Sequence, residues 1–503
     1  MFLILIGIFW PMDYGKTWNQ IGKVRDCFMN PRITIAALKG GSGKTILSLG
    51  LAAVWRDMGY DVAPFKKGPD FIDAGWLSLA TGETCYNLDS FLMNEAQILD
   101  SFLKHSEGAQ ISIIEGNRGL YDGLDLDGCC STAELARLLK APVLIVLDVS
   151  MTTRTMAAIV QGCQVFDPDL NIAGVILNRV AGPRQKKLIT EAIMKYCGIP
   201  VVGSVPKLKE HPFPERHMGL VPHQESGLAR KAISWAKQTV MDNLMVERIL
   251  EIAGQAPQLD GMTLPHKPEP WALDETLRPR IGFIRDQALW FYYPENLSQL
   301  KNLGAELVEL NAISSPRLPK LDALYIGGGF PETQAQALAD NAPFRNALKQ
   351  EIEEGLPVYA ECGGLIYLGE RIRLKNGDYP MVGALPMEFV FQKKPQGHGY
   401  TILETCGHNP YYPVGKTLRG HEFHYSRAVF TAPEESLHFA FNVRRGYGID
   451  GVRDGILRKN VLGTYTHVHA AGQPGWAEGL FKAARDHKKW GQTPEMEKEC
   501  LTT

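Results

Sequence analysis

Short apolar runs alternate with longer amphipathic stretches from Arg32 onward. The amphipathic stretches predict helices, the first of them over Lys44–Met58. The apolar runs predict strands at Ile33–Leu38, Asp61–Phe65, Ile111–Glu115, Val143–Asp148, Ile172–Asn178 and Pro200–Val205. Short β-branched strands that alternate with helices are typical of βαβ units, which build a parallel sheet.

A stretch over residues 254–279 interrupts this rhythm. It is rich in proline, glycine and polar residues and shows no periodicity, so it predicts a linker. Beyond it, strands are predicted at Arg280–Ile284, Ala323–Ile326 and Leu356–Ala360, and then, in a more strand-rich region, near Gly399–Glu404, Phe439–Val443 and Val461–Thr464. We therefore expect two α/β domains, over residues 32–253 and 280–490, with a tail over 491–503.

The first ten residues, Met1 to Trp10, are apolar except for Gly7. They are fewer than the roughly 20 residues that a membrane span needs. They also lack a clear basic start and a small-residue cleavage site, which a signal peptide would have. We expect residues 1–31 to be an N-terminal extension, with Met29 as an alternative start and a targeting role as the alternative function.

Composition narrows the choice of partners. The 503 residues include 53 basic and 55 acidic side chains, for a net charge of −2, which argues against nucleic acid or an anionic membrane as the main partner. A net charge near zero still allows a local basic pocket that binds a small anion. The nine cysteines show no Cys-x-x-Cys spacing, so we expect free thiols and a cytoplasmic protein.

A glycine-rich turn follows the first predicted strand and opens the first predicted helix. It consists of Lys39, Gly40, Gly41, Ser42, Gly43, Lys44 and Thr45. Glycines let backbone N–H groups turn toward phosphate oxygens, and the helix N-terminus adds its positive dipole end. The pattern predicts an ATP site in which Lys44 contacts the β- and γ-phosphates and Lys39 adds a second contact.

Carboxylates at the ends of predicted strands supply the expected Mg²⁺ site. Mg²⁺ prefers hard oxygen ligands, so Thr45, Asp70 and Glu115 are the predicted ligands, and Asp73 is assigned to the substrate. The alternative for the aspartates is helix capping. Asn178, at the end of another strand, is predicted to contact the adenine edge of ATP, although a simple turn residue is the alternative.

A second chemical site is predicted near Cys362. This residue follows a strand and precedes Gly363, an arrangement typical of a nucleophile on a sharp strand-to-helix turn. The late histidine His467 is the candidate base. Gly328 and Gly329, at another strand exit, and Gly363 offer backbone N–H groups for an oxyanion. A lone cysteine is more often an inert core residue, but this context favours catalysis.

These motifs resemble known families. The Cys-Gly-Gly turn and the Gly-Gly-Gly-Phe-Pro-Glu run resemble the class I glutamine amidotransferase domain, and the Lys-Gly-Gly loop resembles the P-loop of partition ATPases and dethiobiotin synthetase. The segments 65–73, 87–89, 121–123 and 215–220 resemble the cobyrinate a,c-diamide synthase family more specifically. The resemblance extends from residue 32 to about residue 485.

The resemblance implies a two-step reaction. Cys362 and His467 would release ammonia from glutamine, while ATP and Mg²⁺ in the first domain would convert a tetrapyrrole carboxylate into an acyl phosphate that ammonia attacks. Two rounds would amidate the a and c acetate groups, as in cobalamin biosynthesis. Lys66, Lys67 and Arg118, with Arg216 as a further candidate, would bind the polycarboxylate, and a homodimer is compatible with the family.

Three departures from the family pattern keep the substrate open. His469 stands where class I triads often have glutamate, so a Cys–His pair or another acid is expected, and Glu361 is not assigned the orienting role because it adjoins the nucleophile. Lys67 and Asn117-Arg118 replace apolar residues. These changes resemble the relative that amidates sirohaem, and a third relative acts on nickel-sirohydrochlorin. An alternative of another class is a regulatory P-loop ATPase with an inactive amidotransferase scaffold.

Overall fold

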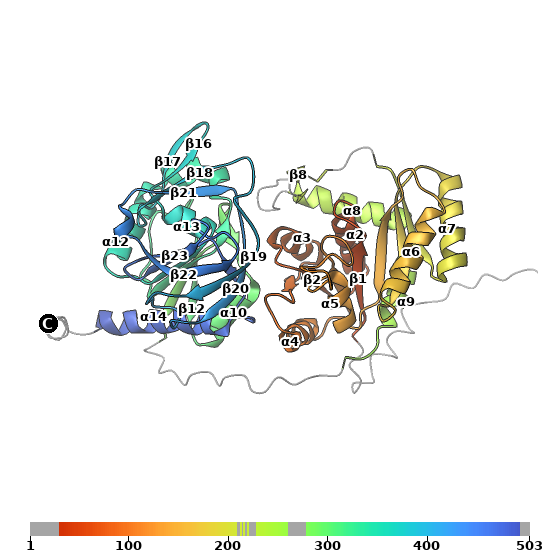
Figure 1. Cartoon of the computed structure of the whole chain (residues 1–503), viewed down its shortest axis with the longest axis horizontal. Coiled ribbons are helices and arrows are strands. Elements are labelled where there is room, and N and C mark those ends of the chain that lie inside the picture. The colour runs from red at the N-terminus through yellow and green to blue at the C-terminus, as the bar shows by residue number, and fades with distance from the viewer. Residues whose placement is uncertain are drawn as a thin grey trace, which may run out of the picture.

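The computed structural model describes residues 30–208, 212–213, 215–216, 219–220, 228–259 and 278–492. Figure 1 shows two halves, formed by residues 30–259 and 278–492. The first 29 residues of the predicted extension, most of the predicted linker and the tail from residue 493 lie outside the described residues. The side chain of Arg216 lies outside them as well.

The first half is built on a seven-stranded sheet in the order β3-β2-β4-β1-β5-β6-β7. All neighbouring strands in it are parallel, which confirms the predicted βαβ arrangement. The strands are β1 (Arg32–Ala37), β2 (Val62–Lys67), β3 (Tyr86–Leu88), β4 (Ile111–Glu115), β5 (Val143–Asp148), β6 (Ile172–Val180) and β7 (Val201–Pro206), with a hairpin of β8 (Glu215–Arg216) and β9 (Gly219–Leu220).

Helices cover both faces of this sheet (Figure 1). They are α2 (Lys44–Asp57), α3 (Phe71–Thr81), α4 (Glu95–Ser106), α5 (Thr132–Leu138), α6 (Thr155–Phe166), α7 (Pro183–Cys197), α8 (Ala229–Asn243) and α9 (Val246–Gly254). Because strand side chains alternate between faces, Ile33 and Ile35 pack in one apolar cluster while Ala36 packs in another. Burial on both faces explains why these strands are continuous apolar runs in the sequence.

The second half is built on a ten-stranded sheet in the order β12-β10-β13-β15-β24-β23-β22-β19-β20-β25. The strands are β10 (Arg280–Ile284), β12 (Glu306–Leu310), β13 (Ala323–Ile326), β15 (Val358–Glu361), β19 (Gly397–Thr405), β20 (Thr417–His424), β22 (His438–Arg445), β23 (Arg453–Arg458), β24 (Val461–Thr464) and β25 (His467–Val468). The part from β12 to β24 is parallel and the rest is antiparallel.

Smaller elements complete this half. The helices are α10 (Pro294–Asn302), α11 (Ala335–Asp340), α12 (Ala342–Glu353), α13 (Gly363–Leu368) and α14 (Pro474–Gln492), with 3₁₀ segments at Pro331–Gln334 and Glu434–Ser436. A four-stranded sheet contains β16 (Arg371–Leu374), β17 (Gly377–Pro380), β18 (Met387–Phe391) and β21 (Ser426–Phe430), and β11 (Leu289–Phe291) pairs with β14 (Gly328–Gly329). The predicted α/β class is confirmed, and the predicted strands lie within two residues of the observed ends.

The two halves contact each other beside α3 and β19. The Tyr400 hydroxyl of β19 donates a hydrogen bond to Asp89 at 2.7 Å, and its ring stacks on Phe91 with centroids 4.4 Å apart. Phe71, the first residue of α3, stacks on Phe291 with centroids 4.8 Å apart. In the parts of the chain that the structure describes, no helix has both the length and the apolar character of a membrane span.

Close packing of α2 against α8 generates a stability prediction. A Cβ at Gly50 of α2 would collide with the carbonyl oxygen of Ala236 and lie 2.6 Å from a methyl group of Val240. We expect Gly50→Ala to lower the free energy of unfolding by about 1–3 kcal/mol, because an overpacked interface must shift. The measurement is the thermal unfolding midpoint of the full chain.

Gly162, on the exposed side of α6, is the matched control because no atom lies within 4 Å of the position that a Cβ would occupy there. Gly162→Ala should raise the free energy of unfolding by up to about 1 kcal/mol, since alanine is the better helix former. Equal midpoints for the two variants would contradict the packing of α2 on α8.

Candidate active sites

The glycine-rich loop connects β1 to α2, as predicted. Gly41 and Gly43 have φ angles of 70° and 94°, a left-handed conformation that glycine adopts without strain. A Cβ at Gly43 would lie 2.5 Å from Nδ2 of Asn178, so the loop also needs glycine there for space. A loop of this shape at a helix N-terminus can surround an anion with backbone N–H groups.

The two lysines of the loop lie in different surroundings. Lys44 is buried, and its ammonium donates to the carbonyl oxygens of Lys39 at 3.4 Å and Arg118 at 2.7 Å. Burial lowers the pKa of Lys44. Lys39 is exposed, with its Nζ 3.8 Å from a carboxylate oxygen of Asp148. Asn178 donates to the Ser42 carbonyl at 2.8 Å and thereby supports the loop, while its predicted contact with adenine stays a prediction.

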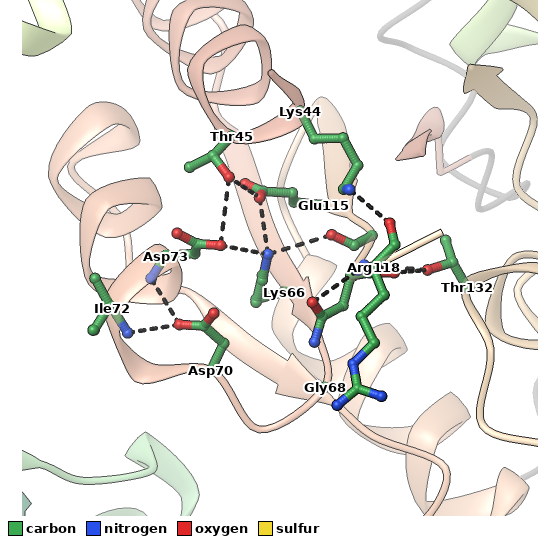
Figure 2. A network of polar contacts seen from close by, with 12 residues as sticks. Lys44, Thr45, Lys66, Gly68, Asp70, Ile72, Asp73, Glu115, Arg118 and Thr132 are labelled. Atoms are coloured by element: carbon green, nitrogen blue, oxygen red, sulfur yellow. Dashed lines mark hydrogen bonds and ion pairs between the residues drawn. The ribbon is translucent and has the colours of Figure 1, made fainter. Parts of the chain in front are cut away.

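A buried polar network lies directly beside the loop (Figure 2). Thr45 donates its hydroxyl proton to Glu115 at 2.7 Å, and its hydroxyl lies 3.4 Å from Asp73. The Lys66 ammonium joins both carboxylates, at 2.7 Å from Asp73 and 2.8 Å from Glu115. The network therefore assembles residues from α2, β2, α3 and β4 at the carboxyl edge of the sheet.

The donor set of this network fits a hard cation. Burial raises the pKa of Glu115 to about 7, and its Oε2 is buried with no hydrogen-bond partner among the described residues. Burial opposes the charge of Lys66, but the carboxylates of Asp73 and Glu115 outweigh it and raise the pKa of this lysine. An unpartnered carboxylate oxygen next to a threonine hydroxyl and a second carboxylate is the oxygen-rich environment that Mg²⁺ prefers.

Asp70 and Lys66 both contact other groups of the protein in this structure, and their predicted roles as Mg²⁺ ligand and substrate contact stay predictions. Asp70 Oδ1 accepts the backbone N–H groups of Ile72 and Asp73 at 2.9 and 3.0 Å, so Asp70 caps α3, the alternative that the sequence allows. Asp73, predicted to contact substrate, instead lies in the network with Thr45. Lys66 is 1% exposed, and its ammonium is ion-paired with Asp73 and Glu115.

The predicted nucleophile lies on a strained turn between β15 and α13. Cys362 has φ 46° and ψ −97°, and backbone strain of this kind is common where a side chain must project into a site. Its Sγ lies 3.6 Å from the carbonyl oxygen of Phe423, and burial raises the pKa of the thiol. A Cβ at Gly363 would lie 2.8 Å from the Gly329 amide nitrogen, so the two predicted oxyanion segments are neighbours.

The structure identifies the acid that orients His467. Nδ1 of His467 lies 3.2 Å from Oε2 of Glu361, which also accepts the Tyr325 hydroxyl proton at 3.1 Å. Glu361 therefore takes the orienting position, although it adjoins Cys362 in sequence and was not expected there. Its side chain leaves the end of β15 toward β25, whereas the chain turns sharply at the next residue. His469 lies instead 3.5 Å from Glu295.

Glu361 could have been found from the sequence by the argument that predicts Glu115. Both are acidic residues that end an apolar, buried strand at the carboxyl edge of a sheet. Among the described residues no hydrogen bond joins Cys362 and His467, so proton transfer between them requires a small rearrangement. Loose catalytic contacts are common in proteins without bound substrate.

A cavity of about 640 Å³ lies between the two halves. Its walls include Lys67, Asp70, Phe71, Asn117, Arg118, Asp122 and Cys130 from the first half and Phe291, Phe330, His398, Tyr400, Glu422, Arg445 and His467 from the second. Phe71 covers His467 within it, with ring centroids 5.4 Å apart. The cavity thus reaches from His467 to the surroundings of the phosphate loop, a connection that sequence reasoning missed.

Comparison with known proteins agrees with this arrangement. Residues 33–221 match the CobQ/CobB/MinD/ParA nucleotide binding domain, and residues 280–475 match the CobB/CobQ-like glutamine amidotransferase domain. A cobyrinate a,c-diamide synthase of Magnetococcus marinus is 42% identical over 92% of this chain and 99% of its own length. The Archaeoglobus fulgidus enzyme of the same name is 43% identical over 91% and 98%.

A further relative of that name, from Methanosarcina acetivorans, is 39% identical over 90% of this chain and 97% of its own length. The similarity therefore extends through both halves and includes the phosphate loop, the Cys362 turn and His467. The chain belongs to the cobyrinate a,c-diamide synthase family of glutamine-dependent ligases.

Proposed function

We propose that this protein amidates the a and c acetate carboxylates of cobyrinate, with ATP as phosphoryl donor and glutamine as nitrogen source. The observation that carries the proposal is the cavity between the halves, which has His467 in one wall and Asp70 and Arg118 in the other. A substrate carboxylate bound in this cavity lies near both the site of glutamine hydrolysis and the site of ATP-dependent activation. The names of the relatives support the choice of cobyrinate.

Glutamine hydrolysis begins with the attack of the Cys362 thiolate on the side-chain amide of glutamine. His467 takes the thiol proton and returns it to the departing ammonia, while Glu361 holds the imidazole in one tautomer and stabilises the imidazolium. Backbone N–H groups near Gly329 and Gly363 stabilise the oxyanion. Water then releases glutamate from Cys362.

Activation of the carboxylate takes place at the phosphate loop. The loop amides and Lys44 orient the ATP phosphates, so that the substrate carboxylate attacks the γ-phosphorus in line. Thr45, Glu115 and Asp73, with Asp70 nearby, would hold Mg²⁺, which neutralises charge on the phosphates when bound. The resulting acyl phosphate has a good leaving group, and ammonia displaces phosphate to give the amide.

Lys67 and Arg118 are the proposed contacts of the first half with the carboxylates of the macrocycle. Both line the cavity, and Figure 2 shows the Arg118 side chain directed away from the buried carboxylate network. The same geometry suits sirohaem or nickel-sirohydrochlorin, so these remain the alternative substrates. We further propose that the enzyme acts in the cytoplasm, and a homodimer stays a prediction.

The substrate proposal predicts a definite product. Purified protein offered cobyrinate, sirohaem or nickel-sirohydrochlorin, each with MgATP and glutamine, should convert one of them to a diamide. Mass spectrometry of the tetrapyrrole should show the change that corresponds to two amidations on cobyrinate. Conversion of another macrocycle alone would reassign the substrate, and conversion of none would reject the ligase function.

The two-site mechanism makes a prediction for the nucleophile. Cys362→Ser should abolish glutamate release from glutamine yet preserve amidation when ammonium salts are supplied, because activation of the carboxylate uses the other half. The measurements are glutamate release and diamide formation in parallel assays. Glutamate release unaffected by Cys362→Ser would show that Cys362 is not the nucleophile, whereas no glutamate release from the wild type would favour a regulatory ATPase with an inactive amidotransferase scaffold.

The position of Glu361 predicts a smaller, selective effect. Glu361→Gln should lower the kcat of glutamine hydrolysis by about 10²–10⁴-fold, because an amide neither stabilises the imidazolium nor fixes its tautomer. Amidation with ammonium should remain near that of the wild type.

Glu295→Gln is the matched control for this substitution, since Glu295 is a buried acid that pairs with His469 rather than His467. It should leave the kcat of glutamine hydrolysis within about threefold, as expected for a group outside the reacting set. Equal losses in both variants would show that Glu361 acts only on the stability of this region.

A further inference from the structure

Three cationic side chains share the cavity between the halves without a carboxylate partner. Lys67 and Arg118 belong to the first half, and Arg445 belongs to the second. Among the described residues, none of the three forms an ion pair with an acidic side chain. Burial also lowers the pKa of Lys67, which a bound anion would reverse.

The acidic side chains that line the same cavity already accept hydrogen bonds from backbone N–H groups of the protein. Asp70 accepts two backbone N–H groups of α3, and Asp122 accepts the Gly119 N–H at 2.8 Å. Glu422 accepts the N–H groups of Tyr447 and Gly448 at 2.5 and 2.8 Å. These amides use the acceptor capacity of the carboxylates and hold them in place, whereas the cationic side chains of Lys67, Arg118 and Arg445 keep their donors for an anionic ligand.

Arg445 is held in position by a residue of the other half. Its guanidinium lies 5.6 Å from the centroid of the Phe91 ring, and Arg419 lies 5.4 Å from the same ring. Phe91 in turn stacks on Tyr400, which is hydrogen-bonded to Asp89. A guanidinium resting on an aromatic face keeps its N–H groups free for a planar acceptor such as a carboxylate.

We propose that Arg445 forms a carboxylate-binding subsite for the macrocycle on the amidotransferase half. This inference rests on the proposed function and names a residue that binds a peripheral carboxylate other than the one being amidated. With Lys67 and Arg118 on the opposite wall, a polycarboxylate macrocycle bridges both halves. Binding of the substrate therefore stabilises the arrangement in which His467 faces the cavity.

The test compares two neighbouring arginines on β22. Arg445→Gln removes the subsite, whereas Arg444→Gln removes an equal charge from a residue that pairs with Glu404 at 2.6 Å. With ammonium as nitrogen source, Arg445→Gln should raise the KM for the tetrapyrrole about tenfold, as expected for loss of one charge-assisted hydrogen-bonded pair. Arg444→Gln should leave that KM within about twofold.

Two further measurements separate binding from folding. The KM for ATP and glutamate release in the absence of tetrapyrrole should be unchanged in Arg445→Gln, and absorbance titration of the chromophore should show the same rise in Kd. Arg445→Lys should recover part of the affinity because it restores the charge without the planar fork.

The outcomes also distinguish this inference from the proposed function. If the wild type amidates a tetrapyrrole and the Arg445→Gln and Arg444→Gln variants have equal KM and Kd values for that tetrapyrrole, the Arg445 subsite is wrong. The ligase function then still stands. If the wild type neither amidates nor binds any of the tetrapyrroles, the proposed function is wrong, and the proposed subsite is wrong with it.

Discussion

The packing of α3 against the amidotransferase half is the contact on which both chemistries depend. The first turn of this helix carries Phe71, which covers His467, and Asp73, which pairs with Lys66 beside the phosphate loop. Two residues of one rigid turn thus connect the glutaminase histidine with the nucleotide site. Asp70 caps α3 and so keeps its first turn rigid. A rotation of α3 would therefore move Phe71 relative to His467 and Asp73 relative to Lys66.

The buried polar network beside the phosphate loop fixes the first turn of α3 in place. Isolated charges are costly to bury, and Lys66 is stabilised only because two carboxylates contact it. The unpartnered oxygen of Glu115 leaves this compensation incomplete in the protein alone. A cation beside the ATP phosphates would complete it and, because Asp73 belongs to α3, would also interact electrostatically with the first turn of this helix.

Much of this architecture could be predicted from the sequence. Strands buried on both faces are continuous apolar runs, which is why β1, β4 and β5 were placed almost to the residue. Strands exposed on one side carry a weaker signal: β16 alternates exposed and buried residues over a short length, and β3 has three residues, so neither was predicted.

The sites divide in the same way. The phosphate loop and the Cys362 turn are local motifs, in which neighbouring residues cooperate and the sequence suffices. The contacts of Phe71 with His467 and of Arg445 with Phe91 join residues far apart in the chain, and only the fold brings those pairs together; the position of Glu361 at a strand end can be recognised in the sequence, but its pairing with His467 cannot. The ion pairs of Lys66 have a similar origin, because its two carboxylate partners lie on different elements.

The aromatic lining of the cavity bears on the nitrogen atom itself. Ammonia attacks an acyl phosphate only as the free base, and in neutral water nearly all of it captures a proton and becomes unreactive. Phe71, Phe291 and Phe330 line the space beside His467 and offer no group that could donate that proton. In the proposed reaction these rings are therefore the part of the cavity lining that leaves ammonia as the free base, the form that can attack the activated carboxylate.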